Sequence, residues 1–383
     1  AIPMTEILTF DEAPPEGTIN FGIGQPSSDL LSLSVIEQAS NAFLGNAHPL
    51  DLNYGASAGD RRFANALAGF LTREYGALTH PGSLMVTNGN SQALDFVCTV
   101  FTRPGDTVFV EEPSYFLAFR ILADHGLNIV GIPIDEDGLI IEAVEAALKI
   151  HEPAFIYTIP SFHNPSAYTM SASRRAQLVA LSLSHDFLIV ADEVYHMLSY
   201  YEAPPMAFGT MIDSGTIISL GSFSKILAPA LRLGWMQASE KLLEKAFENG
   251  VVNSGGSLNH YTSHIARRAI ELGILEQHLM QLRQTFRGRV KAMDEALNSF
   301  LGNTLQWHRP KGGYFFWLAL PEDMDADDLR SRVSDYEIGF QPGSRFSSRG
   351  ELRHFLRLSF SYYNEDDIFE GIERLSRLIA RAR

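Results

Sequence analysis

Residues 187–195 read FLIVADEVY, and residues 216–225 read TIISLGSFSK. In each stretch, a run of apolar residues ends in polar ones. The runs are continuous rather than alternating, which indicates strands buried on both faces, as in a parallel sheet covered by helices. Ligands of open α/β sheets bind outside the carboxyl ends of the strands. The polar residues that follow these two strands are therefore candidates for a functional site.

Strand-like and helical patterns alternate on both sides of these stretches. This order is typical of an α/β fold, and no internal repeat or low-complexity segment interrupts it. We expect strands at 83–87, 107–111, 127–134, 154–159, 187–191 and 216–220, and helices at 91–101, 113–125, 140–150 and 171–185.

The pattern changes near Leu272. One long amphipathic helix is predicted from Glu276 to Leu301, and strand-like runs and a final helix at 365–383 follow it. We interpret this part as a smaller α+β domain, with the N-terminal arm packed on it. The expected organisation is an N-terminal arm and part of the small domain at 1–45, a large domain at 46–275 and a small C-terminal domain at 276–383.

The composition is that of an ordinary globular chain with an acidic balance. Of 383 residues, 45% are hydrophobic and 20% charged, and the net charge is −15. Disordered chains combine low hydrophobicity with high charge, and nucleic-acid binders present positive faces, so both classes are disfavoured. No apolar stretch reaches the roughly 20 residues that cross a bilayer, and no signal peptide is visible. We expect a cytoplasmic protein that binds neither nucleic acid nor membrane.

Lys225 closes the hydroxyl-rich segment Ser222-Phe223-Ser224-Lys225, directly after the strand at 216–220. A lysine at such a strand end can be desolvated and act as the amine of a Schiff base. Arg232 follows in the same loop region, so two hydroxyls and two cations could together hold a dianion. The alternative is an exposed lysine and an arginine in a surface ion pair.

Two charged residues at buried strands need partners. Asp192 follows the strand at 187–191, and a buried carboxylate is costly unless it is paired. Facing a heteroaromatic nitrogen, it would keep that nitrogen protonated; the alternative is a helix N-cap. Arg357 lies in the run at 356–360 and cannot shed its charge, so a planar carboxylate would be its natural bidentate partner. Its alternative is an edge-strand arginine that reaches solvent.

Two further segments follow predicted strands. Gly89, Asn90 and Ser91 join a strand to a helix, and the free N–H groups of a helix N-terminus bind phosphate. Asn164 precedes Pro165 at the end of another strand, where its amide could donate to a phenolic oxygen. Taken alone, each segment is more simply interpreted as a tight turn.

Taken together, these segments resemble the class I and II aminotransferases, enzymes of fold type I that depend on pyridoxal 5′-phosphate (PLP). The resemblance runs from Asn20 to the C-terminus. It implies an α/β fold with a mainly parallel sheet covered by helices in a large domain, beside a smaller α+β domain. The matching segments occur in the family's order: Tyr54-Gly55, Gly89-Asn90-Ser91, Tyr115, Asn164-Pro165, Asp192-x-x-Tyr195, Ser222-x-Ser224-Lys225, Arg232 and Arg357.

The resemblance implies a role for each matching residue. Lys225 forms the Schiff base with PLP and then moves the substrate proton, while Asp192 holds the pyridinium nitrogen and Tyr195 completes the catalytic set. Arg357 clamps the substrate carboxylate, and Gly24 and Asn164 line the substrate side. The other roles are the phenolic oxygen for Asn164 and Tyr195, stacking on the ring for Tyr115, the phosphate for Gly89, Asn90, Ser91, Ser222, Ser224 and Arg232, and the neighbouring subunit's phosphate for Tyr54.

The sequence departs from the family pattern in two segments. The usual Gln-Asn-Pro-Thr-Gly reads His163-Asn164-Pro165-Ser166-Ala167, and the usual Gly-Ser-Gln-Gln reads Gly89-Asn90-Ser91-Gln92. The first departure puts the loop geometry in question. The second puts in question which side chains meet the phosphate. His163 could be an added acid/base group near the ring; the plainer interpretation is a hydrogen-bonding replacement.

The resemblance predicts a homodimer that moves an amino group from an L-amino acid to a 2-keto acid, with sites shared across the interface. Residues 27–33 read SSDLLSL and contain no arginine, which favours neutral, aromatic or apolar substrate side chains. One alternative is another fold type I PLP enzyme, such as a lyase, decarboxylase, racemase or oxidase-like enzyme. A second is a regulator that uses this fold as an effector sensor. No metal site is expected, because His260 and His264 lack a third ligand at a suitable spacing.

Overall fold

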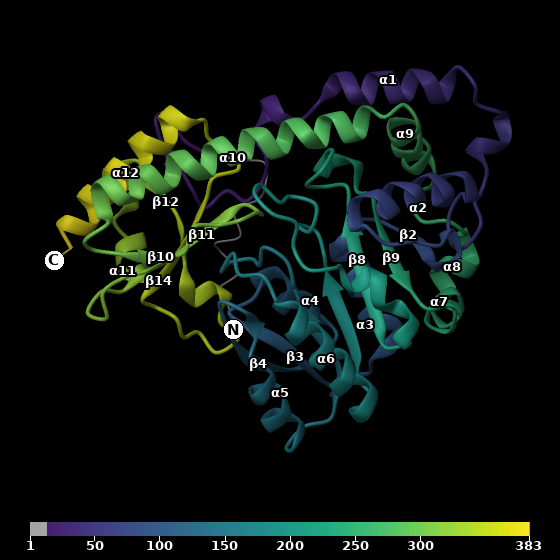
Figure 1. Cartoon of the computed structure of the whole chain (residues 1–383), viewed down its shortest axis with the longest axis horizontal. Helices are drawn as coiled ribbons and strands as arrows, with labels where there is room; N and C mark the ends of the chain where they lie inside the picture. The colour runs from purple at the N-terminus through teal and green to yellow at the C-terminus, as the bar shows by residue number, and fades with distance from the viewer. Residues whose placement is uncertain (1–13, 383) are drawn as a thin grey trace.

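The computed structural model describes residues 14–382, so the first 13 residues of the expected N-terminal arm and Arg383 lie outside the described residues. The described residues form three sheets, one of eight strands, one of four and one of two. The long helix α10 (Ile274–Leu301) runs from the eight-stranded sheet to the four-stranded one (Figure 1). Within residues 14–382, no helix has the length and apolar character that a membrane crossing requires.

The large sheet confirms the predicted α/β fold. Its strand order is β2-β9-β8-β7-β6-β3-β4-β5, and β8, β7, β6, β3 and β4 pair in parallel. Strand β9 is antiparallel to both of its neighbours; the sequence does not predict it, because Gly234 and Gln237 interrupt its apolar run. The strands are β2 (Leu84–Thr87), β3 (Thr107–Glu112), β4 (Asn128–Asp135), β5 (Gly138–Leu139), β6 (Pro153–Thr158), β7 (Leu188–Asp192), β8 (Ile217–Ser222) and β9 (Gly234–Ala238).

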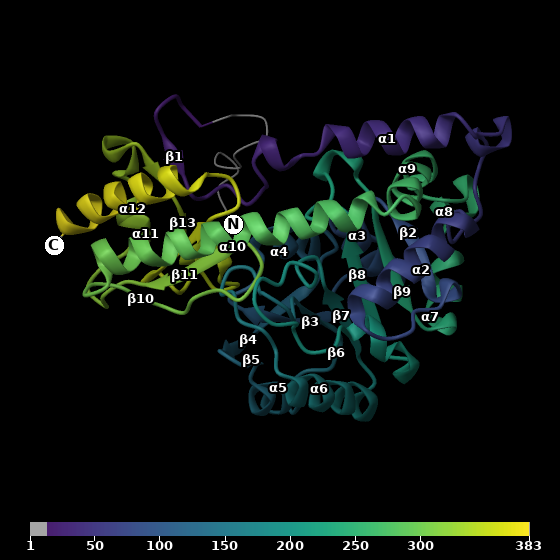
Figure 2. The same cartoon turned by 45° about the horizontal axis from the view of Figure 1, so that its top comes forward.

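The central strands are apolar along most of their length because helices cover both faces of the large sheet. Ile189 packs on one face with residues of α5 and α6, whereas its neighbour Val190 packs on the other face with residues of α2, α3 and α4. Successive side chains of a strand point to opposite faces, so both must be apolar here. Figure 2 shows α5 and α6 below the sheet and α10 above it. The helices are α2 (Arg61–Tyr75), α3 (Asn90–Phe101), α4 (Phe116–Asp124), α5 (Ile141–Leu148) and α6 (Ala172–His185).

The small, four-stranded sheet comes after α10 along the chain and is antiparallel, in the order β10-β11-β14-β13. The N-terminal segment reaches this part, since β1 pairs in parallel with β12. The domain limits at residues 45 and 275 stay predictions. The remaining strands are β1 (Ile19–Asn20), β10 (Gln306–Trp307), β11 (Phe315–Ala319), β12 (Ile338–Gly339), β13 (Gln341–Pro342) and β14 (Phe355–Ser359), and the remaining helices are α1 (Leu33–Leu44), α7 (Glu240–Phe247), α8 (Gly250–Gly255), α9 (His260–Glu271), α11 (Ala326–Arg330) and α12 (Glu365–Ala380).

Gly221 in β8 leaves room for the indole ring of Trp235, its neighbour across the strand pair in β9. A Cβ atom at position 221 would overlap the buried indole ring. Gly221→Ala should therefore lower the free energy of unfolding by about 1–3 kcal/mol, measured by urea denaturation. Gly82→Ala is the matched control, because a Cβ atom there meets nothing within 4 Å. Equal stabilities of the two variants would contradict this account.

Candidate active site

Asp192 ends β7 and is buried, with 7% of its surface exposed. Its Oδ1 accepts hydrogen bonds from Asn90 Nδ2 at 2.6 Å and from the Val194 N–H at 3.3 Å. Its Oδ2 accepts one from the Tyr157 hydroxyl at 2.9 Å. Burial raises the pKa of Asp192, and the donors from Tyr157 and Asn90 oppose that rise. Three donors thus support a buried negative charge at the carboxyl edge of the sheet.

Lys225 lies in the loop after β8, facing the chain's N-terminal part. Its Nζ donates to the Gly24 carbonyl at 2.9 Å and lies 5.3 Å from the centre of the Tyr314 ring. Burial, followed by the positive charge of Arg357, lowers the pKa of Lys225 to about 8. This setting disfavours the alternative of a surface lysine. It also leaves an appreciable share of neutral, nucleophilic amine near neutral pH.

Arg357 lies on β14, between β11 and β13, and is 3% exposed. Its guanidinium packs against the rings of Phe315 and Phe346, at 4.1 and 5.0 Å from their centres. Nη1 donates to Asn164 Oδ1 and Nη2 to the Gly22 carbonyl, each at 2.9 Å, whereas the buried Nε has no partner. Because β14 is an inner strand, the alternative of an edge-strand arginine is excluded. The guanidinium keeps its charge with only neutral acceptors around it.

The N-terminus of α3 and Arg232 form an open, positively charged corner. Gly89 has a φ of 82°, which suits glycine, and a Cβ atom there would lie 3.3 Å from Nη2 of Arg232. Ser91 and Arg232 are both exposed. Free N–H groups at a helix N-terminus beside a guanidinium suit a dianionic phosphate, so the residues present fit that part of PLP.

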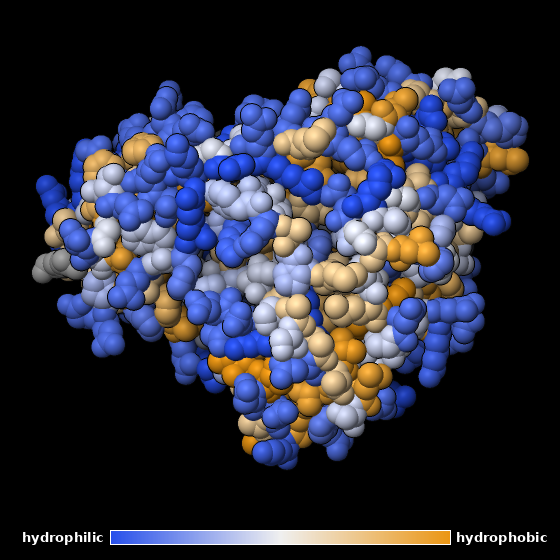
Figure 3. Space-filling model, viewed as in Figure 1, coloured by the Kyte–Doolittle hydropathy of each residue, from blue (hydrophilic) through white to orange (hydrophobic). Residues whose placement is uncertain are grey.

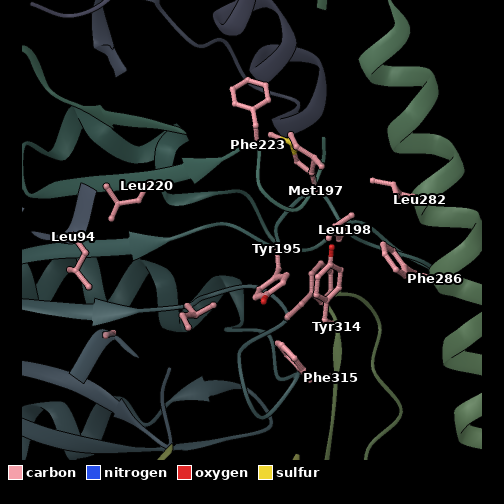
Figure 4. Close-up of a cluster of buried hydrophobic side chains, with 14 of the residues drawn as sticks. Leu94, Tyr195, Met197, Leu198, Leu220, Phe223, Leu282, Phe286, Tyr314 and Phe315 are labelled. Atoms are coloured by element: carbon pink, nitrogen blue, oxygen red, sulfur yellow. The ribbon is translucent and has the colours of Figure 1, made fainter. Parts of the chain in front are cut away.

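Aromatic side chains occupy the space between the sheet edge and α10. The Tyr195 ring lies 5.3 Å from the Tyr314 ring and 5.8 Å from the Phe315 ring, and these three side chains gather beside Phe286 of α10 (Figure 4). Burial, followed by the negative charge of Asp192, raises the pKa of Tyr115 to about 12. These walls offer stacking surfaces and exclude water from the polar groups between them.

His163 is buried, and both of its ring nitrogens face polar partners. Nε2 lies 3.0 Å from Glu111 Oε2, and Nδ1 lies 2.8 Å from the Ser166 hydroxyl. Glu111 in turn accepts hydrogen bonds from the Thr158 hydroxyl and the Ile159 N–H, at 2.6 and 2.8 Å. The bonds between Nδ1 and Ser166 favour the interpretation of His163 as a hydrogen-bonding replacement that holds the turn around Asn164.

Two predicted site residues are placed differently from the others. Tyr54 is 85% exposed and contacts none of the groups described above. The Asn90 side chain points to Asp192 rather than into the phosphate corner. The sequence reasoning missed Tyr157, Phe315 and Phe346. For Tyr157 there was a signal, because a hydroxyl inside a buried strand needs a partner.

A chain with this sheet and these groups at its carboxyl edge is a fold type I enzyme that uses PLP as its cofactor. A family model described as aminotransferase class I and II matches residues 16–375. The chain therefore belongs to the aminotransferase class I and II family and is a PLP-dependent aminotransferase that acts on amino acids.

Similar proteins match nearly the whole chain. Aromatic-amino-acid aminotransferase 1 of Thermococcus litoralis is 31% identical over 366 residues, which cover 94% of this chain and 88% of the relative. The crystal structure of a multiple substrate aminotransferase from Thermococcus profundus matches with a TM-score of 0.89 and 31% identity, over 96% of this chain and 92% of that one. A Pyrococcus horikoshii kynurenine aminotransferase in complex with PMP gives 0.88 and 30%, over 95% and 91%.

The lowered pKa of Lys225 predicts an unusual pH dependence. In competitive acetylation of the cofactor-free protein, Lys225 labelling should rise with a midpoint near pH 8 rather than near its ordinary value of 10.5. Arg357→Leu should move the midpoint upward, because a neighbouring cation disfavours the charged amine. Peptide mass spectrometry measures both, with the exposed Lys291 as the internal reference. An equal midpoint for Lys225 in the wild type and in Arg357→Leu would contradict the proximity of these two charges.

Proposed function

We propose that this aminotransferase is a homodimer that moves the amino group of an aromatic or apolar L-amino acid to a 2-keto acid. The observation that carries the proposal is the buried Arg357 guanidinium. It lies against two phenylalanine rings and near the amine of Lys225, and its protein acceptors are neutral. A planar carboxylate satisfies such a guanidinium bidentately, and the rings beside it suit an apolar side chain.

Each residue contributes a separate step. PLP, when bound, supplies the electron sink for the substrate Cα–H bond. Asp192, kept ionised by its donors, would hold the ring nitrogen protonated, and Tyr115 and Tyr195 would confine the ring. Arg357 would fix the substrate carboxylate and so orient the Cα–H bond. The neutral Nζ of Lys225 would accept the proton from the substrate Cα and donate it again later in the reaction.

The substrate preference follows from the aromatic side chains beside Arg357 and from the contacts of Arg289. Phe116 packs edge-on against Phe346 at 5.4 Å, which extends the aromatic surface beside Arg357. On the side of residues 27–33, Arg289 is already held by the Ser361 carbonyl and the Ser27 hydroxyl, at 2.6 and 3.0 Å. Relatives named for aromatic amino acids, for kynurenine and for 2-aminoadipate are 31%, 30% and 30% identical to this chain. The choice of an aromatic substrate therefore rests on the aromatic rings beside Arg357.

Amino-acid half-reactions test the activity and its substrate class. We expect the absorbance of the holoenzyme to change with phenylalanine or tyrosine alone, with release of one equivalent of keto-acid product per site, and further product to form only when a 2-keto acid is present. The value of kcat/KM should exceed that for glutamate by about 10-fold, since Arg289, the cation on the side of residues 27–33, is already held by Ser361 and Ser27. Lys225→Ala should fold normally yet lose about 10²–10⁴-fold in rate. Turnover without an amino acceptor would favour a lyase or decarboxylase instead.

A dimer is supported by exposed apolar residues around Tyr54. Leu50, Leu52 and Val251 are 68%, 69% and 67% exposed, and Tyr54 is 85% exposed. The segments at 50–55 and 251–257 lie side by side, because the Ser257 N–H donates to the Gly55 carbonyl at 3.3 Å. The face in Figure 3 is mainly hydrophilic, with a hydrophobic spot at its right edge over the segment after α1. An exposed apolar surface of this kind marks an interface, and it would bring Tyr54 to the partner's phosphate.

Subunit mixing tests the shared site. Lys225→Ala lacks the amine of its own site, and Tyr54→Ala lacks the tyrosine that it would give to its partner. A hybrid of the two variants contains one complete site, so a refolded equimolar mixture should regain about a quarter of the wild-type activity. The unmixed variants are the controls. Activity in the mixture no higher than their average would exclude a Tyr54 contribution across the interface.

A further inference from the structure

Asn90 makes contacts that a serine at the same position cannot make. It is the first residue of α3, where the family pattern has serine. Its Nδ2 donates to Asp192 Oδ1 at 2.6 Å and lies 3.3 Å from the Leu220 carbonyl oxygen of β8. Its own Oδ1 is buried and has no hydrogen-bond partner. The amide is therefore oriented by its donor side, toward the carboxylate, and not toward the open corner formed by Gly89 and Arg232.

We propose that Asn90 is a positioning residue for Asp192, and that phosphate binding in this loop is left to the backbone N–H groups, Ser91 and Arg232. The inference rests on the proposed role of Asp192 toward the cofactor's ring nitrogen. The Asn90 amide donates to Oδ1 of Asp192, while the Tyr157 hydroxyl donates to Oδ2 of Asp192. The carboxylate is thus held between α3 and β6 before any cofactor arrives.

The physical reason is the cost of a buried charge. Desolvation favours the neutral form of Asp192, and each donor to its oxygens favours the ionised form. Without the Asn90 amide, Oδ1 would retain only the longer bond from the Val194 N–H, at 3.3 Å. A serine hydroxyl lies one bond closer to the backbone, so it cannot replace that amide. Because only an ionised Asp192 pairs with a protonated ring nitrogen, the effect of Asn90 should pass through that nitrogen.

The test compares PLP with 1-deaza-PLP, in which C–H replaces the ring nitrogen. The dissociation constants of both are measured by titrating the cofactor-free full-length protein. The wild type should bind PLP more tightly than the deaza compound. Asn90→Ser should reduce this preference by about 10-fold, the order of one hydrogen bond to a charged group.

Ser91→Ala is the matched control, since it removes a hydroxyl from the same turn. This variant should bind both compounds more weakly by the same factor, so that the ratio of their two dissociation constants is unchanged. In an Asp192→Asn background, Asn90→Ser should change the ratio no further. The ratio is measured on one folded sample of each variant, and Asn90→Ala provides a second variant if Asn90→Ser does not fold.

Two results would overturn the inference, and they are distinguishable. If Asn90→Ser weakens both compounds equally, Asn90 acts on the phosphate and only the present inference fails. If the wild type itself does not prefer PLP over the deaza compound, Asp192 does not act on the ring nitrogen, and that part of the proposed function fails with it.

Discussion

The site depends on keeping one carboxylate charged where water is nearly excluded. Asp192 lies at the end of a strand that is covered on both faces, so its ionised form must be supported by the protein itself. Donors come from α3, from β6 and from the turn after β7. The parallel arrangement of the strands is what brings these separate segments to one edge. A change in the order of the strands would remove the donors even if every residue were kept.

The two cationic side chains described near this carboxylate, Lys225 and Arg357, are not paired with acidic groups in the part of the chain that the structure describes. Lys225 has no carboxylate partner within salt-bridge distance in residues 14–382, and the cation of Arg357 helps to keep its amine partly neutral. Arg357 has neutral acceptors and two rings as neighbours instead of an acid of the protein. In its proposed role, Arg357 would bind a substrate carboxylate without first giving up an ion pair within the protein.

Much of the fold and part of the site could be predicted from local sequence. Continuous apolar runs predicted β3, β6, β7 and β8, and polar residues at their ends indicated Asp192 and Lys225. Phe315 and Phe346 could not be assigned, and neither could the partner of the Tyr157 hydroxyl, because these roles arise only when strands or loops far apart in sequence become neighbours. The Asn90 side chain could not be placed for the same reason: whether an amide turns to a phosphate or to a carboxylate depends on the distance between α3 and β7.

The helix α10 connects the part of the site on the large sheet with the part on the small sheet. It is a continuous helix of 28 residues, about 42 Å long at 1.5 Å per residue, and it leads from the large sheet, with Asp192 and Lys225, to the small sheet with Arg357. The distance between the Lys225 amine and the Arg357 guanidinium thus depends on how this helix packs on both sides of the site. Arg283 ties the first half of the helix to the Met197 carbonyl oxygen and to Glu74, and Arg289 ties a later part to the Ser361 carbonyl oxygen beside the small sheet. A substitution that shifts this helix would therefore change that distance without touching either group.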